Sequence, residues 1–148
     1  MMALVLAAVS AFAQAFAGSW ICHSQQLLVP WNIAAAPGGN WTTVRWGDQG
    51  SASSGIAMVG YVPALGKWVY RDFHYDGAYA DITGVQSGDQ WRWTGPYYAG
   101  SQQLNGDIVW TLTSRDRIDR TFRSVTNGKL TPSGSDYCVR APAAANPQ

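Results

Sequence analysis

The residues best suited to acid–base chemistry lie in one short segment. His74 has a carboxylate on each side, at Asp72 and Asp76. In an extended chain, residues two positions apart share a face, so Asp72 is expected on the face of His74. A carboxylate placed there can orient an imidazole ring and tune its pKa for general acid–base catalysis. His74 is therefore a candidate general base with Asp72 as its partner, and the simpler interpretation is a partly exposed histidine near a hairpin turn.

Signatures of metal and nucleophile chemistry are absent from the sequence. It contains no CxxC motif, no Cys/His ligand spacing and no Gly-x-Ser-x-Gly elbow. Asp72, Asp76 and Asp81 do not follow the spacing of a calcium-binding loop. We therefore expect no metal and no cofactor, and a haem pocket is conceivable only if His74 faces an apolar wall.

Large aromatic side chains gather on one face of two predicted strands. Residues 90–97 place Trp91, Trp93 and Tyr97 opposite their polar neighbours, and residues 107–113 do the same with Trp110. Such a face either lines a ligand cavity or fills the interior of a small barrel.

A third predicted strand, residues 117–125, sends a charged group to its apolar face. Arg120 alternates with Ile118 and Phe122. Because an unpaired buried charge is too costly to keep, Arg120 needs a partner or an anionic ligand group. It is a candidate anchor for a ligand carboxylate.

Two features of the sequence indicate export. Residues 3–12 are almost wholly apolar and lead to small-x-small sites that end at Ala15 and Ala17, the layout of a cleaved signal peptide over residues 1–15. No Lys or Arg precedes the apolar run, which departs from that pattern, and the alternative is a hydrophobic helix kept in the mature protein. The only cysteines, Cys22 and Cys138, lie at opposite ends of the presumed mature domain and suit one disulfide, with two buried thiols as the alternative. We expect a secreted or periplasmic protein without a transmembrane segment in its mature form.

Composition and turn spacing favour an all-β fold. The chain has 148 residues with no Glu, 16 Gly and a formal charge of +1, so helix formers are scarce and nucleic acid is an improbable partner. Short apolar or alternating stretches separated by turn residues predict nine strands. They cover 20–25, 41–46, 56–62, 67–75, 78–85, 90–97, 107–113, 117–125 and 136–140. A meander of this kind closes into an antiparallel up-and-down β-barrel of about eight or nine strands, here over residues 16–140, followed by a disordered tail over 141–148.

The longest apolar stretch outside these strands is residues 27–36, which contain Trp31. It could fold over the barrel mouth as a lid that contacts ligand through Trp31. A short helix or an extra strand against the barrel fits the sequence equally well.

The start and the end of the domain resemble the calycin barrels, the group of lipocalins and their relatives. Gly18-Ser19-Trp20 resembles their Gly-x-Trp signature, and the frame from Gly18 to Arg140, with a cysteine near each end, resembles small secreted bacterial lipocalin-like domains. The resemblance implies that Trp20 plugs the closed end and that an arginine of a late strand covers it, with Arg120 as the matching position, or less favourably Arg123. The function of these domains is itself open, so fold transfers better than activity.

A second, local similarity is to avidin. Trp93-Thr94-Gly95 with Tyr97, and then Trp110 to Ser114, are similar to two stretches of the biotin-binding barrels. The chain offers no match to the rest of a biotin site.

Together these patterns predict a secreted protein that binds a small apolar or amphipathic molecule. Its cavity would be lined by Trp91, Trp93, Tyr97 and Trp110, with Arg120 and Trp31 as further contacts. The alternatives are an enzyme that uses the same cavity with His74 as general base, and a structural, envelope-associated domain with a filled core. The ligand and the oligomeric state are not indicated.

Overall fold

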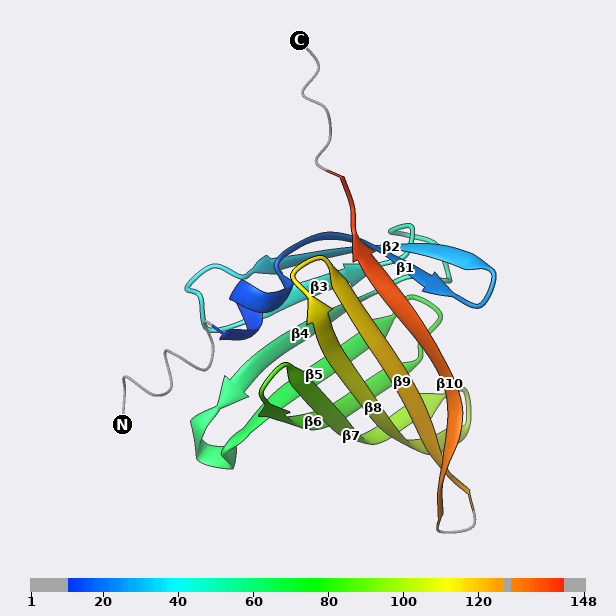
Figure 1. Cartoon of the computed structure of the whole chain (residues 1–148). Coiled ribbons are helices and arrows are strands. Elements are labelled where there is room, and N and C mark those ends of the chain that lie inside the picture. The colour runs from blue at the N-terminus through cyan, green and yellow to red at the C-terminus, as the bar shows by residue number, and fades with distance from the viewer. Residues whose placement is uncertain (1–10, 127–128, 143–148) are drawn as a thin grey trace.

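The computed structural model describes residues 11–126 and 129–142. Most of the predicted signal peptide, the predicted turn at 127–128 and most of the predicted tail lie outside these ranges. A short helix over residues 11–16 leads into the first strand (Figure 1). No helix among these residues combines the length and the hydropathy needed to span a bilayer.

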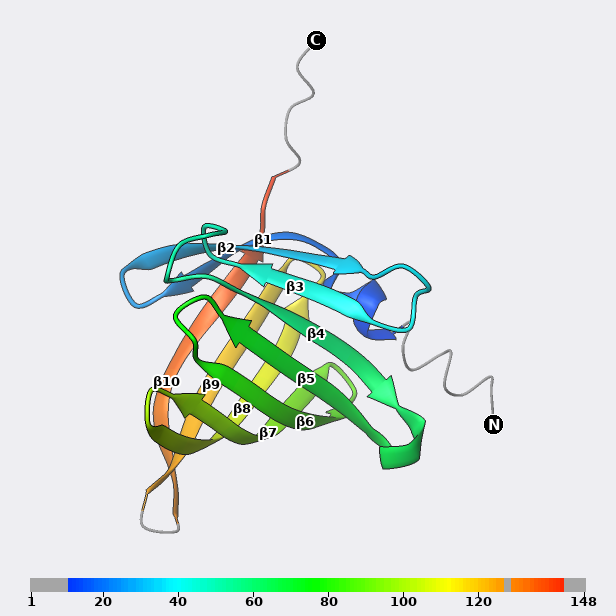
Figure 2. The same cartoon turned by 180° about the vertical axis from the view of Figure 1, so that it is seen from behind.

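The described chain forms a closed antiparallel barrel of ten strands, so the predicted fold class is confirmed and the predicted strand number is one too low. Each strand pairs with the next along the sequence, and β1 pairs with β10 to close the sheet (Figures 1 and 2). The strands are β1 (Gly18–Ser24), β2 (Leu27–Ala35), β3 (Thr42–Trp46), β4 (Gly55–Val62), β5 (Lys67–His74), β6 (Tyr79–Ser87), β7 (Gln90–Ala99), β8 (Gln102–Ser114), β9 (Arg117–Thr126) and β10 (Lys129–Arg140).

The additional strand is β2, which the sequence left open as a lid, a helix or a strand. Trp31 and Ile33 point into the barrel, whereas Leu27 and Leu28 are 65% and 67% exposed. Apolar residues on both faces hide the alternation that marks a strand. Trp31 is therefore part of the barrel wall, and the lid interpretation is wrong.

The inward face of β5 could not be chosen from the sequence. In the structure Trp68 and Tyr70 are buried inside the barrel, and Asp72 and His74 follow them on the same face at the other end of the strand. Phe73, on the opposite face, is half exposed. The two candidate acid–base residues therefore point into the lumen.

A disulfide between Cys22 and Cys138 joins the first and last strands, as predicted. The two residues are direct partners in the β1–β10 ladder, so the bond lies on the seam that closes the barrel. It spans 116 residues of sequence and holds the two ends of the sheet together.

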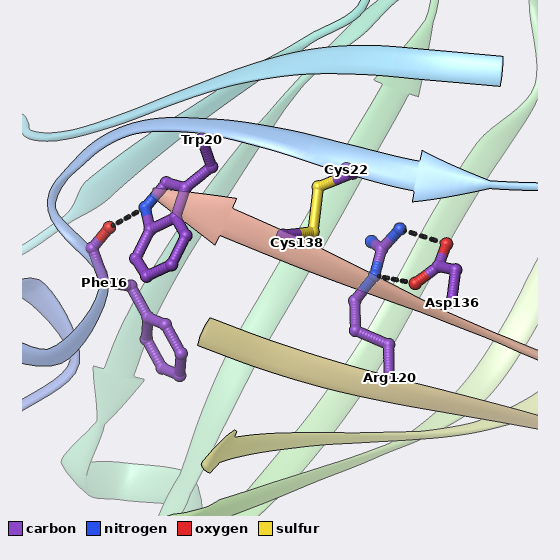
Figure 3. The surroundings of a disulfide bond; sticks show 6 residues. All are labelled: Phe16, Trp20, Cys22, Arg120, Asp136 and Cys138. Carbon is purple, nitrogen blue, oxygen red and sulfur yellow. Dashed lines mark hydrogen bonds and ion pairs between the residues drawn. A yellow bond between two sulfur atoms is a disulfide. The ribbon is translucent and has the colours of Figure 1, made fainter. Parts of the chain in front are cut away.

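The interior has a filled half and a hollow half. Phe12 and Phe16 of the N-terminal helix are fully buried and pack against tryptophans of β5, β7 and β8. We call residues 11–16 the plug. Figure 3 shows Phe16 and Trp20 on one side of the disulfide and the Arg120–Asp136 pair on the other, along the same wall.

Candidate ligand-binding site

The hollow half of the barrel contains a cavity of about 430 Å³ that is partly open to solvent. This volume lies within the range of small-molecule sites, roughly 300–1,000 Å³. Its walls are mostly apolar and aromatic, with a few polar groups between them. The main lining side chains are those of Trp31, Trp46, Tyr70, Asp72, His74, Ala80, Ile82, Trp93, Tyr97, Ile108, Trp110, Arg120, Phe122 and Asp136.

One polar group in the wall is a buried ion pair between β9 and β10. Arg120 donates from Nε and Nη2 to the two carboxylate oxygens of Asp136, each at 2.6 Å (Figure 3). The two side chains are only 10% and 3% exposed. The Arg120 guanidinium also lies over the Trp31 ring at 4.4 Å from its centroid, a cation–π contact. Asp136 therefore supplies the partner that Arg120 needs.

The Nη1 group of Arg120 has no hydrogen-bond partner among the described residues. Its two N–H donors remain for a further acceptor, but the positive charge is already compensated by Asp136. A neutral carbonyl or hydroxyl oxygen suits this position better than a second carboxylate.

The second polar group joins β3 and β5. Asp72 accepts a hydrogen bond from Trp46 Nε1 at 3.0 Å, and its other oxygen lies 3.2 Å from His74 Nε2. The Trp46 and His74 rings meet edge to face, with centroids 4.6 Å apart. The predicted pairing of His74 with Asp72 is therefore present, and Trp46 fixes the carboxylate that orients the imidazole.

Two tyrosines face the cavity between these groups. Burial raises the pKa of Tyr70 well above its ordinary value, and the nearby Asp72 carboxylate adds to this increase. Burial also raises the pKa of Tyr97, with further contributions from Asp76 and Asp72. Both phenols stay protonated at neutral pH and can donate a hydrogen bond to a ligand.

The structure brings five of the six predicted ligand-contact residues to this cavity. Trp31, Trp93, Tyr97, Trp110 and Arg120 line it. Trp91 does not, because it lies in the filled half with its ring centroid 4.7 Å from that of Phe16. Trp93 and Trp110 contact both sides, since they line the cavity and also pack against Phe12.

The arginine that covers Trp20 is Arg140, not Arg120 or Arg123. The Arg140 guanidinium lies 4.2 Å from the Trp20 ring centroid, and its Nη1 donates to the Ala17 carbonyl. Glycine is favoured at position 18 because its φ is +130°, a backbone conformation that residues with a side chain rarely adopt. Arg123 instead pairs with Asp107. Trp20 thus lies beside Phe16 of the plug, in the filled half of the barrel.

The cavity residues that sequence reasoning missed include Trp46, Tyr70 and Asp136. Trp46 alternates with buried Thr42 and Val44 on β3, which could have marked it as inward-facing. Asp136 lies two residues before Cys138, so the inward direction of the cysteine also indicated that of the aspartate.

Comparisons with known proteins add no relative. A scan against models of protein families finds no match for this chain, and no curated protein matches it. Among the described residues, no group of three or more His, Cys, Asp or Glu side chains could hold a metal ion. The closed antiparallel barrel is consistent with a calycin-like fold.

Proposed function

We propose that the protein is an exported binding protein that holds one small amphipathic molecule in the barrel cavity. The observation that carries this proposal is the combination of a 430 Å³ cavity with aromatic walls and a small number of fixed polar groups. A barrel that served only as a structural domain would have a packed lumen. The disulfide is compatible with export to an oxidising compartment.

The lining predicts the chemistry of the ligand. An apolar body would lie between Trp93, Trp110 and Ile108, while a neutral oxygen acceptor would face Arg120 Nη1 or the phenol of Tyr70. Long-chain fatty acids, retinoids, terpenoids and haem are suitable probes, because they differ in the shape of the apolar body and in the charge of the polar end.

A titration of tryptophan fluorescence with these probes tests the proposal. We expect at least one probe to bind at micromolar concentration and Trp110→Ala to weaken it. Ala80→Phe should abolish binding, because Ala80 is buried on the lumen face of β6 and a phenyl ring there would project into the cavity and collide with a bound molecule. Val85→Phe is the matched control, since Val85 is on the same strand but 53% exposed. Equal loss in both variants, or no binding by any probe, would overturn the proposal.

The second candidate function is catalysis, favoured by the chain of contacts from Trp46 through Asp72 to His74. Asp72 orients the imidazole, and His74 Nδ1, which has no hydrogen-bond partner among the described residues, could take a proton from a bound substrate. His74→Gln separates the two functions. In a binding protein it changes affinity slightly, whereas in an enzyme it removes turnover of a molecule that still binds.

A further inference from the structure

We propose that the plug is removable, and that its loss on export exposes a second binding compartment for a planar aromatic ring that carries a hydrogen-bond acceptor. This inference rests on the proposed binding function and names the part of the ligand that enters deepest. The two interpretations of the N-terminal segment therefore imply two different binding sites. If the segment is a cleaved signal peptide, the site includes the second compartment, and if it is a retained helix, the site is the cavity alone.

The rings that surround Phe12 define the shape of the compartment. Its ring centroid lies 5.7 Å from that of Trp68, 5.9 Å from Trp91, 6.1 Å from Trp93 and 6.2 Å from Trp110. We call these four tryptophans the indole box. Phe12 is fully buried, so the box already encloses one six-membered aromatic ring.

The polarity of the compartment is not matched by the plug. The indole nitrogens of Trp91 and Trp93 are buried and have no hydrogen-bond partner among the described residues. The plug offers them phenyl rings, whereas Trp20 Nε1 donates to the Phe16 carbonyl at 2.8 Å. Because a buried N–H without a partner is unfavourable, an aromatic molecule with an acceptor oxygen would suit the box better than Phe12 does.

The position of the predicted cleavage sites permits removal of the plug. A cut after Ala15 or after Ala17 removes Phe12, and the second cut removes Phe16 as well. All ten strands begin at or after Gly18. The disulfide and the stacking of the Arg140 guanidinium on the Trp20 ring lie downstream of both sites, so the closure of the barrel does not depend on the plug. A cut after Ala17 also removes the Ala17 and Phe16 carbonyls, which accept hydrogen bonds from Arg140 and Trp20.

The vacated compartment would be continuous with the cavity described above. Trp93 and Trp110 contact Phe12 on one side and line the cavity on the other. They therefore form the floor of the cavity while the plug is in place. Without the plug, a ligand can extend past these two rings to Trp91.

The experiment compares two forms of the same chain. The processed form is purified after export, and the full chain is produced without export in an oxidising cytoplasm; intact mass identifies the N-terminus of each. Calorimetric titration with coumarin, which has a carbonyl oxygen, is compared with naphthalene, which has a similar size and no acceptor. We expect the exported form to lack residues 1–15 or 1–17 and to bind coumarin at least tenfold more tightly than the full chain does.

Substitutions in the box test the role of the indole nitrogens. The Trp91→Phe/Trp93→Phe double variant of the processed form, which lacks both unpartnered indole donors, should lose the preference for coumarin over naphthalene while naphthalene still binds. Trp41→Phe is the control, because Trp41 is 37% exposed and lies outside the lumen-lining residues. An unchanged preference in the double variant would overturn the assignment of the acceptor.

The remaining outcomes separate this inference from the proposed function. Two results would overturn the inference: exported protein that retains residues 11–16, or a processed form that binds coumarin no better than the full chain does. The proposed function stands in either case if Ala80→Phe still abolishes binding of an amphipathic probe. If no probe responds to Ala80→Phe either, both proposals fail.

Discussion

Arg120 and Asp136 form an ion pair inside the barrel in which each side chain compensates the charge of the other. We predict that Arg120→Ala lowers the free energy of unfolding by about 3–5 kcal/mol, because it leaves Asp136 buried and unpaired. Urea denaturation measures this change. Arg71→Ala is the control, since Arg71 pairs with Asp81 on the surface, and its loss should stay within about 1 kcal/mol. Similar losses in the two variants would contradict the assigned role of Asp136.

Tyr70 should remain protonated in the folded protein when tyrosines of ordinary pKa, near 10, ionise. A pKa raised by folding means that its contribution to stability is complete below about pH 10 and is lost as the pH rises further towards the folded-state value. In an ultraviolet pH titration of the folded protein, Tyr70→Phe should leave the step near pH 10 unchanged. In urea the same variant should lose one of seven tyrosine equivalents. A smaller step in the folded variant would show that Tyr70 titrates normally.

For single residues, the sequence shows that a side chain requires an interaction partner more readily than it shows which residue that partner is. That Arg120 must be paired followed from its alternation with Ile118 and Phe122, but its pairing with Asp136 depends on the register of β9 against β10. The arginine over Trp20 was assigned to the wrong strand for the same reason. Arg140 reaches Trp20 because β10 lies beside β1 only after the barrel closes.

The strands β7, β8 and β9 are tied together on the outer face by one buried carboxylate. Asp107 accepts hydrogen bonds from Arg92 and Arg123 on either side. Burial acts to raise the pKa of Asp107, but these two hydrogen bonds outweigh it and hold the pKa below its ordinary value. The resulting stabilisation is present above about pH 4 and is lost as the pH falls through the folded-state pKa.

Asp107→Asn should therefore lower the free energy of unfolding at pH 7 by about 1–3 kcal/mol. It should also weaken the dependence of stability on pH below pH 4. Denaturation at pH 7 and pH 3 checks both effects. An equal loss at the two pH values would show that the charge of Asp107 is not what joins the strands.

The β1–β10 seam depends on the disulfide. Because the bond closes a loop of 116 residues, the Cys22→Ala/Cys138→Ala double variant should lose about 4–5 kcal/mol in the chain-entropy model. Chemical denaturation of the oxidised protein and the variant gives the difference. The reduced wild-type protein should match the variant, and a reduced protein as stable as the oxidised one would contradict the prediction.

Most strands could be predicted because Gly and Asn or Asp mark the turns between alternating segments, as at Asp76-Gly77 and Gly88-Asp89. Asn105-Gly106 has the same composition but lies within β8 instead of in a turn. β2 escaped prediction because Leu27 and Leu28 expose apolar groups next to a half-buried strand face. Where both faces carry apolar residues, periodicity alone does not distinguish a strand from a helix.

The division of the lumen into a filled half and a hollow half is determined by the whole molecule and not by any one strand. No single strand indicates it, since Trp91 and Tyr97 share β7 and one face yet lie in the filled and the hollow half. The sequence predicted an aromatic interior but could not decide between a cavity and a packed core. That outcome depends on how far the residues before β1 reach into the barrel.

Native mass spectrometry of the protein purified from its own host tests the binding function most directly. The wild-type protein should carry one small molecule that denaturation releases, and Ala80→Phe, whose phenyl ring projects into the cavity, should carry none. Val85→Phe should retain the same added mass. A wild-type protein without any added mass, or an added mass that persists in Ala80→Phe, would contradict binding in the barrel cavity.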